Sequence, residues 1–188
     1  MLMNKQALIV MADGFEDIEA VAPIDVLTRA GVKVTIAGLE KGQIKAAYGT
    51  TIVPDIDVDS VDGTYDVIIF PGGRKNAESL AKHPKVIELA RHHFKVGKIV
   101  AAICAAPSHV LAEAAGLLVD KRATGDPGFN DRLAAAGAIV TNEQVTVDGN
   151  FVTAMGPGAA MLFALMLTEK IAGKAVADQY AAKWMITR

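Results

Sequence analysis

The only cysteine, Cys104, is the first residue whose type and position could support covalent chemistry. It follows the apolar run Ile99–Ile103, which predicts a buried strand, and it precedes Ala105-Ala106-Pro107. Proline is common in the first turn of a helix, so the thiol is predicted at a strand-to-helix turn similar to a nucleophile elbow. Amide dipoles at a helix N-terminus lower the pKa of a thiol. From position alone, an inert buried cysteine is an equally good interpretation.

Carboxyl groups that could assist this thiol follow the first predicted strand, at Glu16, Asp17 and Glu19. Acidic residues in the first turn of a helix usually complement its dipole in water, and this interpretation fits Glu16 and Asp17. Glu19 lies three residues beyond Glu16, so the two share one side of the helix. One of them can therefore point across the strand ends toward Cys104.

Two glycine-containing turns could complete a site. Gly72-Gly73 follows the apolar run Val67–Phe70 and Pro71, where backbone N–H groups could bind an oxyanion, although a tight turn also explains the pair. Gly156-Pro157-Gly158 precedes a long apolar helix and could line a pocket. Neither turn completes a dinucleotide or phosphate-binding motif.

Metal and cofactor chemistry finds no support in the sequence. The four histidines form no H-E-x-x-H pattern, and no second cysteine exists to share a metal. His109, five residues beyond Cys104, should lie roughly 140° around a regular helix and should not face the thiol. We therefore expect no metal and no cofactor.

Short apolar runs alternate with helical segments along the whole chain, which predicts an α/β fold. Continuous apolar runs indicate parallel strands buried on both faces, with the site at their carboxyl ends. The predicted strands are Ala7–Met11, Val32–Ala37, short strands within Ile44–Asp59, Val67–Phe70, Ile99–Ile103, and a hairpin of Val145–Val147 with Phe151–Ala154. The predicted helices are Phe15–Ala30, Pro84–Val96, Ala106–Ala115, Phe129–Ala136, Gly158–Ile171 and Lys174–Lys183.

Composition limits the class of protein. The 188 residues fit one domain, residues 1–188. A net charge of −2 gives no electrostatic reason to expect a nucleic acid or an anionic membrane as partner. One cysteine permits no internal disulfide, and no apolar stretch approaches the roughly 20 residues that span a bilayer. We expect a soluble cytoplasmic protein.

The motifs together resemble the ThiJ/PfpI family, in the branch of the parkinsonism-associated deglycase and its bacterial relatives. The resemblance rests on the order and spacing of four segments that span nearly the whole chain. They are Ala12-Asp13-Gly14-Phe15-Glu16-Asp17-Ile18-Glu19, Tyr65-Asp66-Val67-Ile68-Ile69-Phe70-Pro71-Gly72-Gly73, Ala101-Ala102-Ile103-Cys104-Ala105-Ala106-Pro107 and Gly156-Pro157-Gly158.

This resemblance implies a flavodoxin-like three-layer sandwich, with a mostly parallel sheet and helices on both faces, and usually a homodimer. It implies that Cys104 is the nucleophile and the oxidation-sensitive residue, and that Glu19 is its partner, a protonated carboxyl group. The backbone N–H groups of Gly73 and Ala105 would form an oxyanion pocket. Similar proteins are described as glutathione-independent glyoxalases, protein deglycases and redox-responsive chaperones.

Some positions depart from the family pattern. Asp126 stands where many relatives carry a histidine near the cysteine, and Tyr48 stands where a second subunit often lends an arginine to the pocket. Arg29 matches the other basic residue of that pocket, and Pro157 is expected to line it. Ala105 stands where the peptidase branch has a histidine, so we do not expect proteolysis.

Three functions follow from these residues. The first is an enzyme that handles reactive aldehydes, free or on glycated protein, through Cys104 and Glu19. The second is a redox sensor or holdase chaperone in which Cys104 is oxidised to a sulfinate. The third is a small-molecule-binding protein with an inert cysteine.

Overall fold

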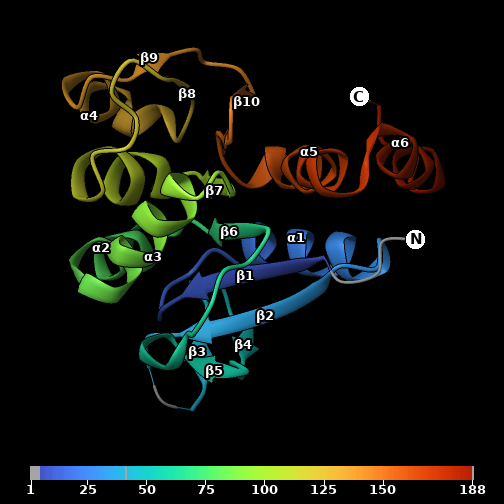
Figure 1. The fold of residues 1–188 in the computed structure, drawn as a ribbon, viewed down its shortest axis with the longest axis horizontal. Coiled ribbons are helices and arrows are strands. Elements are labelled where there is room, and N and C mark those ends of the chain that lie inside the picture. The colour runs from blue at the N-terminus through green and yellow to red at the C-terminus, as the bar shows by residue number, and fades with distance from the viewer. Residues whose placement is uncertain (1–4, 41, 188) are drawn as a thin grey trace.

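The computed structural model describes residues 5–40 and 42–187, which form a sheet with the strand order β10-β11-β7-β6-β1-β2-β5 (Figure 1). Neighbouring strands pair in parallel, except that β10 runs antiparallel to β11. The strands are β1 (Gln6–Met11), β2 (Lys33–Gly38), β5 (Ile56–Asp57), β6 (Val67–Phe70), β7 (Ile99–Ile103), β10 (Val145–Asp148) and β11 (Phe151–Ala154). The predicted mostly parallel sheet is confirmed.

Strand β1 shows how the sheet separates two layers of helices, because its side chains alternate between the faces. Ala7, Ile9 and Met11 pack with α1 (Asp17–Arg29) and α5 (Ala160–Ala172). Leu8 and Val10 pack on the other face. That face is covered by α2 (Arg74–Lys82), α3 (Pro84–Lys95), the π-helix η2 (Pro107–Ala114) and α4 (Asn130–Ala135). The three-layer, flavodoxin-like arrangement is thereby confirmed (Figure 1).

The remaining elements are short or peripheral. Helix α6 (Lys174–Lys183) packs on α1 and α5 through Val26, Leu165 and Ala181. The predicted strands of the 44–59 segment are β3 (Ile44–Lys45), β4 (Thr51–Ile52) and β5, which precedes the 3₁₀ turn η1 (Val58–Ser60). The sequence did not predict the pair β8 (Arg122–Ala123) and β9 (Ile139–Val140). Two more 3₁₀ turns are η3 (Pro127–Phe129) and η4 (Pro157–Ala159). Within the described residues, no helix is long and apolar enough to cross a membrane.

Helix η2 follows the cysteine but is wider than the regular helix that the sequence predicts. The carbonyl oxygen of Ala105 accepts hydrogen bonds from the backbone N–H of His109 and from the Ser108 hydroxyl, and it contacts His109 Nδ1 at 2.8 Å. Side chains that bond to the backbone compete with the regular helical ladder. At the far end, Ala115 N–H donates to Val110, five residues back. Such π-type turns often occur at functional sites.

Helix α2, directly after Gly73, was not predicted. Its buried positions are Asn76, Ala77 and Leu80, so its apolar stripe is too weak to indicate a helix. Asn76 is fully buried: it accepts from Ala12 N–H at 2.6 Å and donates to the carbonyl oxygens of Pro71 and Gly72. This amide therefore ties the end of β1 to the turn that follows β6.

We predict that Asn76→Asp destabilises the fold by about 3–5 kcal/mol, because a buried carboxylate would face two carbonyl oxygens with no donor. Urea unfolding at pH 7 measures the loss. The matched control is Asn142→Asp, since exposed Asn142 uses only its side-chain oxygen, as an acceptor from Asn130. That control should change stability by less than about 0.5 kcal/mol. Equal stability of both variants would contradict the role given to Asn76.

Candidate active site

Cys104 occupies a strained turn between β7 and η2. Its φ is 63°, a left-handed conformation that costs a residue other than glycine roughly 1–2 kcal/mol. The turn is held from both sides, because Cys104 N–H donates to Ala154 at 2.9 Å and Asp126 N–H donates to the Cys104 carbonyl oxygen at 2.8 Å. The predicted strand-to-helix turn is confirmed, and its geometry turns the sulfur out of the line of the strand.

Glu19 is the carboxyl group that reaches this sulfur. It lies in the first turn of α1, is fully buried, and approaches Cys104 beside Gly72. Its Oε2 accepts the N–H of Gly72 at 2.8 Å, whereas Oε1 is buried with no hydrogen-bond partner among the described residues. Glu16 caps α1 by accepting Glu19 N–H at 2.8 Å. Glu16 thus complements the N-terminus of α1 as expected, but it is only 7% exposed and does so away from water.

Gly72 and Gly73 must lack side chains because other atoms of the site approach them closely. A Cβ atom on Gly72 would lie 2.3 Å from Glu19 Oε2 and 2.5 Å from Cys104 Cβ. Gly73 has φ 83°, and a Cβ there would lie 2.1 Å from the Gly14 carbonyl oxygen. Its N–H lies near enough to Cys104 to lower the pKa of the thiol, as an oxyanion donor in this turn would. The Gly72 N–H is engaged by Glu19, and the role of Ala105 N–H stays a prediction.

Burial, followed by the negative charge of Glu16, raises the pKa of Glu19 to about 8. A carboxyl group with such a pKa is mostly protonated at neutral pH. Since Oε2 already accepts from Gly72, we assign the proton to Oε1, from which it can be donated to the sulfur.

The thiol is not acidified as the sequence suggested. Burial and the negative charge of Glu19 raise the pKa of Cys104 to about 12, and the hydrogen bond from Gly73 only partly opposes them. Helix η2 begins three residues beyond the thiol, at Pro107. The Glu19 charge does not act on the thiol while Glu19 holds its proton. The protonation state of Glu19 therefore shifts the pKa of Cys104, in addition to the effect of burial.

The sulfur lies where two cavities meet. Cys104, Asp126 and Pro157 line both of them. One cavity, of about 410 Å³, is mostly apolar and also touches Met155 and Ala159. The other, of about 690 Å³, is lined by charged groups that include Lys45, Arg74, Glu16 and Asp13. Small molecules can therefore approach the half-buried thiol from two sides.

The other predicted residues fall in different places. Tyr48 is 81% exposed and lines the charged cavity. Arg29 does not line either cavity of this chain, because it lies at the other end of α1, paired with Asp25 at 2.6 Å. Its part in a pocket completed by a second subunit stays a prediction. His109 contacts Arg132, 2.6 Å away, and lines neither cavity, as the sequence suggested.

Several residues at the site were missed. Arg74 and Lys75 follow the double glycine directly, and their position after a predicted turn at the strand ends was the available signal. Gln144 and Met155 line the apolar cavity. Met155 directly precedes the Gly156-Pro157-Gly158 turn, which was the available signal, whereas Gln144 lies outside every motif.

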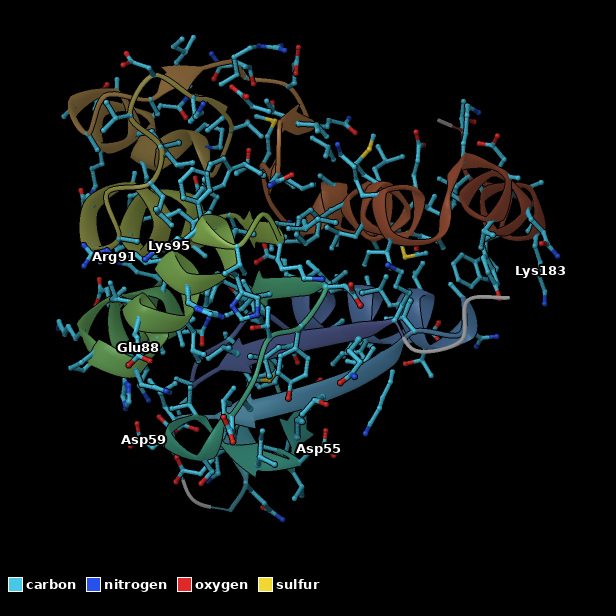
Figure 2. The ribbon with its side chains drawn as sticks, viewed as in Figure 1. Asp55, Asp59, Glu88, Arg91, Lys95 and Lys183 are labelled. Carbon is cyan, nitrogen blue, oxygen red and sulfur yellow. The ribbon has the colours of Figure 1, made fainter. Side chains whose placement is uncertain are left out.

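We predict that wild-type protein loses stability as pH rises from 5 to 8.5, relative to Glu19→Gln. The folded state holds a proton on Glu19 up to about pH 8, whereas the unfolded chain releases it near pH 4.3, so stability declines between these values. The difference should reach a few kcal/mol in urea unfolding. Glu88→Gln is the control, since Glu88 lies exposed on the outer side of α3 (Figure 2) and should keep the wild-type slope. Parallel pH profiles for wild type and Glu19→Gln would contradict the assignment.

Comparison with known proteins agrees with this geometry. The model of the DJ-1/PfpI family matches residues 5–170. The Parkinson disease protein 7 homolog of Danio rerio is 36% identical over 185 residues, covering 96% of this chain and 97% of that protein. The glutathione-independent glyoxalase DJR-1.2 of Caenorhabditis elegans is 35% identical over 175 residues and covers 92% of each.

Solved structures show the same fold. Drosophila melanogaster DJ-1beta superposes with a TM-score of 0.93 at 35% identity, covering 99% of this chain and 100% of that one. Oxidized Toxoplasma gondii DJ-1 gives a TM-score of 0.92 at 34% identity, covering 98% of this chain and 100% of that one. With the cysteine, the buried carboxyl group and the double glycine in place, the chain belongs to the DJ-1/PfpI family.

Proposed function

We propose that this protein converts small 2-oxoaldehydes, such as methylglyoxal, to hydroxy acids without glutathione. The observation that carries the proposal is a buried Glu19 beside Cys104, both against Gly72, where the thiol lines two cavities. One relative is named a glutathione-independent glyoxalase, which supports the same reaction class.

The first step is the addition of sulfur to the aldehyde. The S–H bond breaks, a sulfur–carbon bond forms, and the proton reaches the former aldehyde oxygen by exchange through the Glu19 carboxyl group. The product is a hemithioacetal on Cys104. Gly73 N–H is placed to stabilise the oxyanion as it develops.

The second step is an isomerisation. The hydrogen on the former aldehyde carbon leaves as a proton and is returned to the neighbouring carbon, which converts the adduct to a thioester of lactate. A pKa near 8 lets Glu19 both accept and donate protons close to neutral pH. Water then cleaves the thioester, releasing lactate and the thiol. The sequence is redox-neutral and uses no cofactor.

We predict lactate release from methylglyoxal by the purified protein at pH 7.5. Cys104→Ala should abolish release because no thioester can form. Glu19→Gln should lower kcat by roughly 10²–10⁴-fold, the usual contribution of general acid–base catalysis. Glu88→Gln should match wild type. Equal rates for wild type, Cys104→Ala and Glu19→Gln would refute the proposal.

A second candidate function is redox sensing. In a sulfinate, the Cys104 oxygens could accept hydrogen bonds from protonated Glu19 and from Gly73 N–H, two of the groups beside the sulfur. The Toxoplasma gondii relative has been solved in an oxidized form. This function needs no turnover of an aldehyde, and a holdase chaperone activity would belong to it.

For this second function we predict that mild peroxide adds two oxygen atoms to Cys104 before it oxidises the methionines. Peptide mass spectrometry measures both, with Met185, 91% exposed, as the internal reference. The glutamine side chain of Glu19→Gln keeps a hydrogen-bond donor but has no acidic proton. The substitution should therefore change how many oxygen atoms peroxide adds to Cys104. Oxidised Met185 beside an intact Cys104 thiol would exclude the sensor.

The partners of this protein are proposed from the family resemblance. Ile18 and Val21 are exposed apolar residues on α1, which is consistent with association into a homodimer. Glycated protein is an alternative source of the aldehyde-derived group, and a cytoplasmic location is expected.

A further inference from the structure

The sulfur contacts a second carboxyl group, Asp126, which the proposed reaction has not used. Asp126 Oδ2 lies 3.8 Å from Cys104 Sγ. The loop that carries it is fixed, since Asp126 N–H donates to the Cys104 carbonyl oxygen and Asp126 Oδ1 accepts Gly128 N–H, both at 2.8 Å. Oδ2 is therefore the oxygen left to face the sulfur.

The two carboxyl groups differ in access to water. Glu19 is fully buried and its Oε2 is held by Gly72, so solvent does not reach it. Asp126 is half-buried and lines both cavities. A thioester on Cys104 needs a water molecule and a base beside its carbonyl carbon, and a base can act on a reacting centre through one water. Asp126 meets this requirement and Glu19 does not.

Building on the proposed function, we propose that Asp126 is the catalytic base that activates the hydrolytic water, while Glu19 serves addition and isomerisation. Asp126 Oδ2 takes one proton from water as the water oxygen bonds to the thioester carbon. The carbon–sulfur bond then breaks, and the sulfur leaves with the proton that Asp126 received. Lactic acid and the free thiol result, and the carboxylate is restored.

A structural role for Asp126 can be separated from this one. Its Oδ1 caps the turn η3 by accepting Gly128 N–H, and the side-chain oxygen of asparagine can make the same bond. Asp126→Asn therefore keeps the cap and removes the base. The Asp126→His variant restores a base, because the histidine imidazole is neutral at pH 8.

The experiment mixes methylglyoxal with each protein at pH 8, quenches with acid, desalts, and measures intact mass and free lactate. Asp126→Asn should accumulate protein carrying the mass of one methylglyoxal, because a thioester survives desalting whereas a hemithioacetal dissociates. Hydroxylamine should remove that mass and release the hydroxamate of lactate. Steady-state lactate release should fall by roughly 10²–10⁴-fold, and Asp126→His should restore part of it.

Asp131→Asn is the matched control, since it removes an exposed carboxylate of α4 outside both cavities and should behave as wild type. The inference would be overturned if Asp126→Asn released lactate as fast as wild type and accumulated no adduct. In that case the proposed function would still stand. Slow release without any stable adduct would place Asp126 before the thioester and overturn it as well. If wild type releases no lactate, the proposed function fails and the inference fails with it.

Discussion

The site depends on a proton held in an apolar interior between an oxygen and a sulfur. Glu19 is removed from water by α1 and by the turn after β6, and a buried carboxyl group keeps its proton because charge is costly there. On the Glu19 side the sulfur is then next to a hydrogen-bond donor, while the Asp126 carboxylate lies 3.8 Å from it on another side. Gly72 and Gly73 leave the space in which Glu19 and Cys104 approach each other, because a side chain at either glycine would collide with its neighbours.

Chain conformation brings the pair together. The left-handed backbone at Cys104 directs the side chain away from β7, and bonds from β11 and from the Asp126 loop hold that conformation. Such strain persists only where the surroundings fix it. The parallel sheet provides those surroundings, since it aligns the ends of β1, β6 and β7 at one edge. The fold thus supplies rigidity, and the loops supply the chemical groups.

Much of this was readable from the sequence, for identifiable reasons. Continuous apolar runs predicted the central strands, and Cys104 and Gly73 stood out because they follow such runs, whereas the choice of Glu19 came from the family resemblance. Helix α2 was missed because one of its three buried positions is the polar Asn76, which leaves only Ala77 and Leu80 as an apolar stripe. The acidity of the thiol was misjudged because helix dipoles can be inferred locally, whereas burial and the charge of Glu19 are tertiary facts. Arg29 ends α1, whereas Glu19 lies in its first turn, so the part of Arg29 in a pocket stays a prediction.

The positive φ of Cys104 has an evolutionary consequence. Glycine adopts this conformation without the steric penalty, so a lineage that no longer used the thiol would fold more stably with glycine at position 104. Alanine would keep the penalty and lose the chemistry. A cysteine at such a position therefore carries a conformational cost that glycine would not, as is typical of residues held in strained conformations at functional sites.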